Sequence, residues 1–169
     1  MNLIENKERI FSQVAQAMET ANRRDQVNVI AVTKYVGIDQ AKALVDTGVC
    51  HIGENRVDKF LEKYQALKDE GLTWHLIGSL QRRKVKEVIN FVDYFHALDS
   101  MKLAQEIQKR ASHPIKCFIQ VNISGEESKH GFAPEELDAI LPELEGLDNL
   151  QIVGLMTMAP FEASQDELQ

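Results

Sequence analysis

The spacing of apolar residues changes along the chain and divides it into helix-like and strand-like segments. From Ile10 to Ala21, apolar residues recur every three or four positions, as on one face of an amphipathic helix. Residues 27–32 then read VNVIAV, a β-branched run that favours a strand buried on both faces of a parallel sheet. We therefore expect an opening helix followed by a buried strand.

Beyond this run, the two kinds of segment alternate to the end of the sequence. The expected strands are at 27–32, 51–54, 74–77, 94–97, 115–121 and 152–156. The expected helical faces lie at 38–46, 57–67, 85–92, 103–111 and 134–144. Pro134 suits the first turn of the last helix, and Pro142 should kink or shorten it.

Alternation of this kind predicts a parallel sheet wrapped by helices, which exists in two architectures. One is an open doubly wound sheet and the other is a (β/α)8 barrel, and periodicity does not separate them. The sequence has no internal repeat, low-complexity tract or linker, so we expect residues 1–169 to form a single domain. Its last four residues look like the start of another helix, so we expect this domain to be partial.

Composition and charge narrow the classes of partner. The chain is 44% hydrophobic and 27% charged, which is typical of a globular protein. Its net charge of -7 would repel nucleic acid and anionic membranes. No apolar run approaches the roughly 20 residues of a membrane helix, and the start lacks a secretory signal, so we expect a cytoplasmic protein.

Cysteine and histidine spacing provides no metal motif. Cys50 and Cys117 are far apart, and we expect each to pack as a small buried apolar group. The five histidines are at 51, 75, 96, 113 and 130, without an HExxH or a paired spacing. We therefore expect no metal site.

Polar residues follow the carboxyl ends of the expected strands, where parallel α/β proteins gather functional groups. Lys34 follows the first strand, and a lysine there is unusual because burying an ammonium group is unfavourable. Partial desolvation favours the neutral amine, which can attack an aldehyde, so Lys34 is a candidate for a Schiff base. The alternative is a lysine whose amine simply reaches the solvent.

Two other side chains are candidates to hold a ring near Lys34. The Asn55 amide and the His75 imidazole can hydrogen-bond a phenolate oxygen or contact a ring face, although a structural role is the better interpretation of either residue taken alone. The basic run at 81–86 is more typical of a solvated face. The polar loop at 124–131 lacks the glycine spacing of a phosphate-binding motif.

Five sequence words, taken in order, resemble the pyridoxal phosphate homeostasis proteins. They are AVTKYV at 31–36, GENRVDKFLEK at 53–63, WHLIGSLQRRKVK at 74–86, QVNISGEESKHGF at 120–132 and GLMTMAP at 154–160. The resemblance covers nearly the whole chain. It implies an α/β fold, a (β/α)8 TIM-type barrel like the N-terminal domain of alanine racemase, here an N-terminal helix plus about six βα units.

The resemblance also implies a cofactor site. It implies that Lys34 carries pyridoxal 5'-phosphate (PLP) as a Schiff base, and that Asn55, His75 and Met156 lie near the cofactor. Arg83 departs from the family pattern, which usually has asparagine before the lysine. Family members continue to a seventh and an eighth strand, whose loops bind the cofactor phosphate, so we expect this sequence to be a truncated form or part of a longer protein.

Three functions follow from these features. The first is a non-catalytic, monomeric PLP-binding protein of PLP homeostasis, with PLP-dependent apoenzymes as candidate partners. The second is a racemase-like enzyme, which needs a second base that alanine racemase takes from another domain and a partner subunit. The third, an unrelated barrel enzyme or scaffold using the loop at 124–131, would apply if Lys34 were exposed and unreactive.

Overall fold

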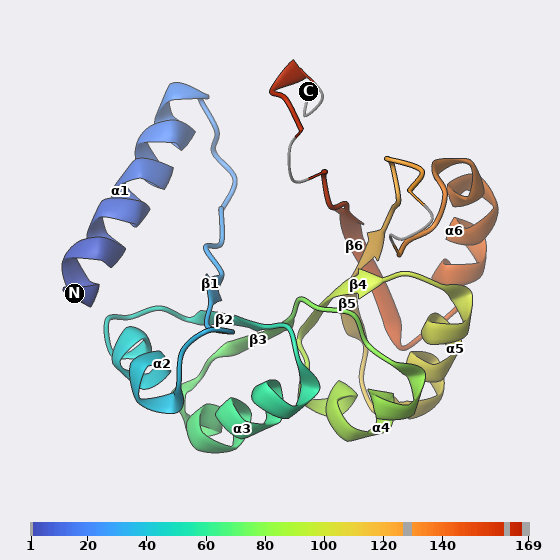
Figure 1. The fold of residues 1–169 in the computed structure, drawn as a ribbon, viewed down its shortest axis with the longest axis horizontal. Coiled ribbons are helices and arrows are strands. Elements are labelled where there is room, and N and C mark those ends of the chain that lie inside the picture. Colours follow the sequence, from blue (N-terminus) through green and yellow to red (C-terminus); the bar gives the residue numbers. More distant parts are fainter. Residues whose placement is uncertain (1, 127–129, 161–162, 167–169) are drawn as a thin grey trace.

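Six parallel strands form one curved sheet in the computed structural model, which describes residues 2–126, 130–160 and 163–166. The strands follow one another across the sheet in chain order (Figure 1). Their bounds are Ala31–Val32 (β1), His51–Glu54 (β2), Thr73–Leu76 (β3), Tyr94–Leu98 (β4), Ile115–Gln120 (β5) and Leu150–Met156 (β6).

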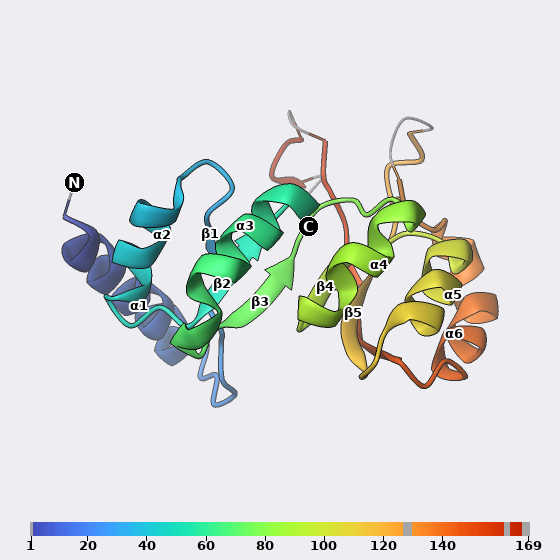
Figure 2. The same cartoon turned by 90° about the horizontal axis from the view of Figure 1, so that it is seen from below.

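The helices that follow the first five strands cover the outer side of the sheet in chain order, whereas the N-terminal helix lies beside the β1 end, as two perpendicular views show (Figures 1 and 2). The α-helices are Leu3–Thr20 (α1), Ile38–Val45 (α2), Val57–Leu67 (α3), Val85–Val88 (α4), Met101–Arg110 (α5) and Leu137–Glu145 (α6). Short 3-10 turns cover Lys68–Glu70 (η1), Arg82–Lys84 (η2), Ile89–Phe91 (η3) and Pro134–Glu136 (η4). None of the described helices is both long and apolar enough to cross a membrane.

The strand order decides between the two expected architectures. A doubly wound sheet reverses its strand order at a switch point, whereas a barrel adds each strand beside the preceding one. The described strands run from β1 to β6 without a reversal. The barrel class is therefore confirmed, with an N-terminal helix, five βα units and a sixth strand in the described part of the chain, and the doubly wound alternative is wrong.

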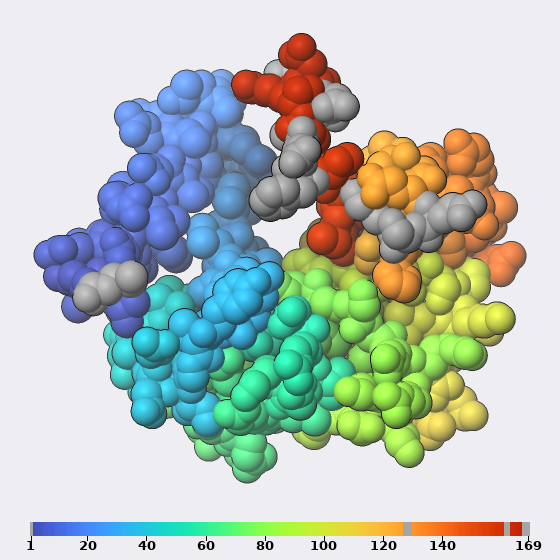
Figure 3. All heavy atoms as spheres, viewed as in Figure 1, coloured from blue at the N-terminus to red at the C-terminus, as the bar shows by residue number. Residues whose placement is uncertain are grey.

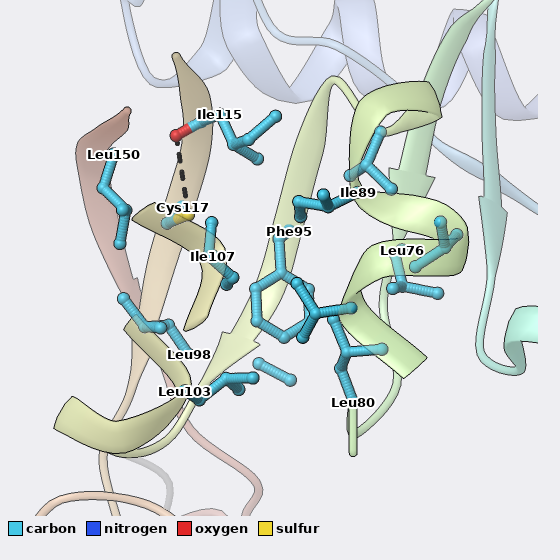
Figure 4. Packing of buried hydrophobic residues seen from close by; sticks show 14 of the residues in the cluster. Leu76, Leu80, Ile89, Phe95, Leu98, Leu103, Ile107, Ile115, Cys117 and Leu150 are labelled. Atoms are coloured by element: carbon cyan, nitrogen blue, oxygen red, sulfur yellow. Dashed lines mark hydrogen bonds between the residues drawn. The ribbon is translucent and has the colours of Figure 1, made fainter. Parts of the chain in front are cut away.

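One set of strand side chains packs outward against the helices and forms the core. Leu76 and Phe95, which are in register on β3 and β4, are fully buried, as is Ile119 on β5. Figure 4 shows Phe95 within this core, with Ile107 of α5 on one side and Leu76 and Ile89 of η3 on the other. Burial of these apolar surfaces fixes the helices to the sheet.

The alternate set of side chains faces the inner side of the curved sheet. Successive side chains of a strand point to opposite faces. Gly53 is in register with Val32 of β1 and His75 of β3, and His75 is in register with Tyr94 of β4. Lys34, two residues beyond Val32, therefore opens onto the same inner side.

The first strand is shorter and more exposed than its sequence indicates. A strand covering 27–32 and buried on both faces was expected, but β1 contains Ala31 and Val32, and Val32 is 52% exposed. Among the described strands, β1 pairs with β2 alone, and no layer covers its inner face. The prediction of burial on both faces is wrong because an apolar run shows what a segment can bury and not which neighbours cover it.

The two cysteines differ in their surroundings. Cys117 of β5 is buried, as expected, and burial raises the pKa of its thiol to about 12. Cys50 is exposed in the segment before β2, so the expectation of burial is wrong for this residue. Pro134 lies in η4 at the start of the last helical segment, as expected, and α6 ends at Glu145, soon after Pro142.

Paired substitutions at Ile119 and Leu155, which lie on the same face of the sheet, test how far the helices cover that face. These residues are directly in register across β5 and β6, but Ile119 is fully buried and Leu155 is 60% exposed. We expect Ile119→Ala to lower the free energy of unfolding by about 2–5 kcal/mol, because it removes buried contacts and leaves a cavity. Leu155→Ala should change it by less than about 1 kcal/mol. Urea denaturation of the 169-residue chain measures both, and equal losses would contradict this packing.

Candidate functional site

A cavity of about 560 Å³ lies at the carboxyl ends of the strands. Its wall includes residues that follow or end several strands, among them Lys34, Asn55, Gln120 and Met156. Figure 3 shows the molecule hollowed on its inner side, between the blue N-terminal part and the orange and red C-terminal part. The volume lies in the range of pockets for small molecules and cofactors.

Lys34 reaches the cavity from just beyond β1. The residue is half-buried, and its Nζ atom lies 5.0 Å from the centroid of the Tyr35 ring. Tyr35 is 88% exposed, so this contact lies at the rim of the cavity. Within the described part of the chain, the Lys34 amine forms no ion pair. It is therefore available to an electrophile in the cavity.

The structure brings three of the four sequence candidates together around this cavity. Lys34, Asn55 and Met156 all line it, although they lie far apart in the chain. Gln120, which was not among the residues expected from the sequence, also lines it; this residue is buried at the end of β5, and its side-chain amide donates to the His130 carbonyl oxygen at 3.1 Å. A buried polar residue ending a strand is the same signal that singled out Lys34.

Gly78 allows the segments after β2 and β3 to approach closely. A Cβ atom at position 78 would lie 2.1 Å from the Asn55 carbonyl oxygen, well inside van der Waals contact. The Ile77 N–H donates to the Glu54 carbonyl oxygen at 2.8 Å, which extends the strand pairing to this point. Because glycine has no side chain, position 78 leaves room for the Asn55 backbone in the cavity wall.

His75, the fourth candidate, is not among the residues that line the cavity. It lies two residues before Ile77, which does line it, and is the middle member of a histidine chain. His51 Nδ1 lies 2.9 Å from His75 Nε2, and His75 Nδ1 lies 2.9 Å from His96 Nε2. Contact of His75 with a cofactor stays a prediction.

Parallel pairing explains why the sequence did not reveal the histidine chain. The three rings come from β2, β3 and β4. His51 and His75 are 24 residues apart in sequence, and His75 and His96 are 21 residues apart. Their spacing therefore fits no local motif. Among the described residues, no group of three His, Cys, Asp or Glu side chains is arranged to hold a metal ion.

The buried surroundings keep His75 neutral. Burial, together with the neighbouring His96 and His51 rings, lowers the pKa of His75 to about 3. Burial also lowers the pKa of His96. His75 stacks on Tyr94 with 4.7 Å between ring centroids. A neutral imidazole has one N–H and one lone pair, so His75 donates to one neighbour and accepts from the other.

A buried ion pair lies behind the cavity wall, on the side of the sheet that α3 covers. Lys63 Nζ of α3 lies 2.5 Å from Glu54 Oε1, and these two side chains are 2% and 0% exposed. Lys63 Nζ also donates to the Thr33 carbonyl oxygen at 2.9 Å. The Thr33 hydroxyl donates to the same Glu54 oxygen at 2.6 Å. This network was not expected from the sequence.

Comparison with known proteins links the chain to one family. Residues 6–169 match the model of the alanine racemase N-terminal domain. The pyridoxal phosphate homeostasis protein of Aquifex aeolicus is 37% identical over 100% of this chain and 76% of its own length. The corresponding protein of Synechocystis is 32% identical over 95% of this chain and 75% of its own length.

Solved structures agree with this similarity. PipY of Synechococcus elongatus, determined with PLP bound, is 32% identical, with a TM-score of 0.78 over 90% of this chain and 73% of its own. An alanine racemase of Clostridium difficile is 19% identical, with a TM-score of 0.63 over 81% of this chain and 37% of its own. The second similarity concerns the fold alone.

Replacing Gly78 by alanine tests the close approach beside Asn55. We expect Gly78→Ala to lower the free energy of unfolding by about 1–3 kcal/mol, because the added methyl group must push the Asn55 backbone away. Gly146→Ala at the end of α6 is the matched control, since its Cβ would meet no atom closer than 3.4 Å. It should change stability by less than about 1 kcal/mol. Denaturant titration of both variants gives the comparison, and equal effects would argue against a clash at position 78.

Acidification tests the buried state of His75. An unfolded histidine binds a proton with a pKa near 6.5, whereas folded His75 stays neutral down to about pH 3. The unfolded state therefore binds more protons below pH 6.5, so the stability present above that pH is lost as the pH falls through it. Between pH 7.5 and 5, His75 alone should remove about 2 kcal/mol.

The variant His75→Gln isolates this contribution, because glutamine does not titrate. Denaturant titrations at pH 7.5 and pH 5 should show a smaller loss of stability in the variant than in the wild-type chain. An identical loss in the two proteins would mean that His75 is not kept neutral by the fold.

Proposed function

Since this chain belongs to the family of pyridoxal phosphate homeostasis proteins, we propose that it binds PLP covalently through Lys34 and acts in PLP homeostasis. The observation that carries this proposal is the Lys34 amine, which lines a cavity of suitable size and has no ion-pair partner among the described residues. The PLP-bound structure of PipY supports the choice of ligand.

The residues around the cavity suit this chemistry. PLP supplies an aldehyde, and the neutral amine of Lys34 adds to its carbon; loss of one water then leaves a carbon–nitrogen double bond. We assign the Asn55 amide to hydrogen bonding with a polar group of the ring, and the Met156 thioether to contact with the ring. His75 is a proposed neighbour of the ring from the layer beneath the cavity lining.

We propose a non-catalytic role, because the curated relatives at 37% and 32% identity are named as homeostasis proteins. The racemase-like alternative requires a second base in the site. His130 is the imidazole that it would use, since this side chain lines the same cavity and lies 3.8 Å from Asp99 Oδ2. Racemisation of an amino acid that disappears in both Lys34→Ala and His130→Gln would favour the enzyme.

The cellular setting and partners are part of the same proposal. We propose a monomeric protein of the cytoplasm, with PLP-dependent apoenzymes as the recipients of its cofactor. The net charge of -7 supports a role away from nucleic acid. Most of the loop at 124–131, which the scaffold alternative would use, is described, but residues 127–129 lie outside the described part of the chain.

Borohydride reduction tests the covalent attachment. The chain is incubated with PLP, reduced, digested and analysed by mass spectrometry, and we expect one modified lysine, Lys34. Lys34→Ala should lose the modification because it lacks the amine. Lys59→Ala is the control, because Lys59 is an exposed lysine paired with Glu62 on α3, and it should retain the modification at Lys34. Modification spread over surface lysines, or absent from Lys34, would refute the proposal.

A further inference from the structure

The residues that precede Lys34 and Asn55 form one buried network on the other side of the sheet. Thr33 precedes Lys34, and Glu54 precedes Asn55. Because side chains alternate along extended backbone, Thr33 and Glu54 point toward α3 while Lys34 and Asn55 line the cavity. The network therefore lies one residue away from two members of the candidate site.

The contact from Lys63 acts on the peptide group that carries Lys34. The Thr33 carbonyl oxygen belongs to the planar peptide unit that runs from the Thr33 Cα to the Lys34 Cα. This oxygen accepts from Lys63 Nζ at 2.9 Å and from the Val36 N–H at 3.1 Å. Since β1 ends at Val32, these two bonds fix the plane beyond the end of the strand.

Stability alone does not explain a buried ion pair in this place. Removing two charges from water is unfavourable, and apolar side chains of similar size often serve folding as well or better. Glu54 Oε2 is buried and accepts no hydrogen bond from a described residue, so the ammonium and the hydroxyl meet one carboxylate oxygen. The feature that the pair does determine is the geometry of the Thr33–Lys34 peptide.

We propose that Glu54 and Lys63 are positioning residues for Lys34. Lys63 holds the Thr33–Lys34 peptide plane, and Glu54 holds Lys63 together with the Thr33 hydroxyl. The backbone that carries the Lys34 amine is therefore fixed at the cavity. This fixed position lowers the conformational entropy lost when the amine binds a ligand aldehyde. This inference rests on the proposed function of Lys34 in binding PLP.

The double variant Glu54→Gln/Lys63→Met tests this role. It removes both charges at once and so avoids leaving a lone buried charge, which is the strongly destabilising case. We expect its urea midpoint to stay close to that of the wild-type chain, and its dissociation constant for PLP to rise about tenfold or more. Without PLP, amide hydrogen exchange at Val36 should accelerate about tenfold, because its acceptor, the Thr33 carbonyl oxygen, loses its anchor.

A second lysine–glutamate pair, in which both residues lie on α3, provides the matched control. Lys59 Nζ lies 2.7 Å from Glu62 Oε2, and both side chains are exposed. Glu62→Gln/Lys59→Met makes the same chemical changes on α3 away from the cavity. PLP binding and amide exchange at Val36 should both remain at wild-type values in this control.

The outcomes separate the two proposals. If Glu54→Gln/Lys63→Met is stable and both PLP binding and exchange are unchanged, the network does not position Lys34 and the inference is overturned. If the wild-type chain forms no bond to PLP at Lys34, the proposed function fails, while amide exchange without PLP still decides on positioning.

Thr33→Val is a second variant for the case in which the double variant does not fold. It keeps the shape of Thr33 and removes the hydroxyl that donates to Glu54. Weaker PLP binding by about threefold or more, with faster exchange at Val36, supports positioning. Unchanged binding and exchange in a folded Thr33→Val chain overturns it.

Discussion

Parallel pairing of the strands in chain order is the constraint on which the core and the candidate site both depend. Each strand adds to the one before it, so the register from β1 to β6 decides which side chains face the helices and which face inward. A slip of one residue in β2 would move Glu54 to the inner side and Gly53 to the helices. The same register holds the apolar core on one face and the polar groups on the other.

Most of the fold was predictable because the alternation of strands and helices follows from the local spacing of apolar residues. The segments from β2 to β6 lie close to the expected ranges, and the sequence placed Lys34, Asn55 and Met156 at strand ends that meet around one cavity. The extent of β1 was not predictable, because Val32 is as apolar as a core residue but lacks covering neighbours. The local apolar pattern shows that a segment can be buried. Whether it is buried depends on which other elements pack against it.

The less predictable parts of the site are those that depend on contacts between distant strands. His51, His75 and His96 appear as isolated histidines in the sequence and become one chain only when three strands align. Glu54 and Lys63 belong to the words that carry the family resemblance, yet their pairing needs the position of α3 on the sheet. The role of Gly78 likewise depends on the Asn55 carbonyl oxygen beside it, which is distant in sequence.

The histidine chain has a direction. In a form with one N–H on each of the three rings, His75 donates to one neighbour and accepts from the other, so all the hydrogen bonds run in the same direction. When His51 Nδ1 donates, the outer nitrogen of His51 is left as a lone pair and that of His96 carries a proton; the opposite sense exchanges these two ends. The same ring positions therefore fit two opposite directions of hydrogen bonding, which present opposite polarities at the β2 and β4 ends of the histidine chain.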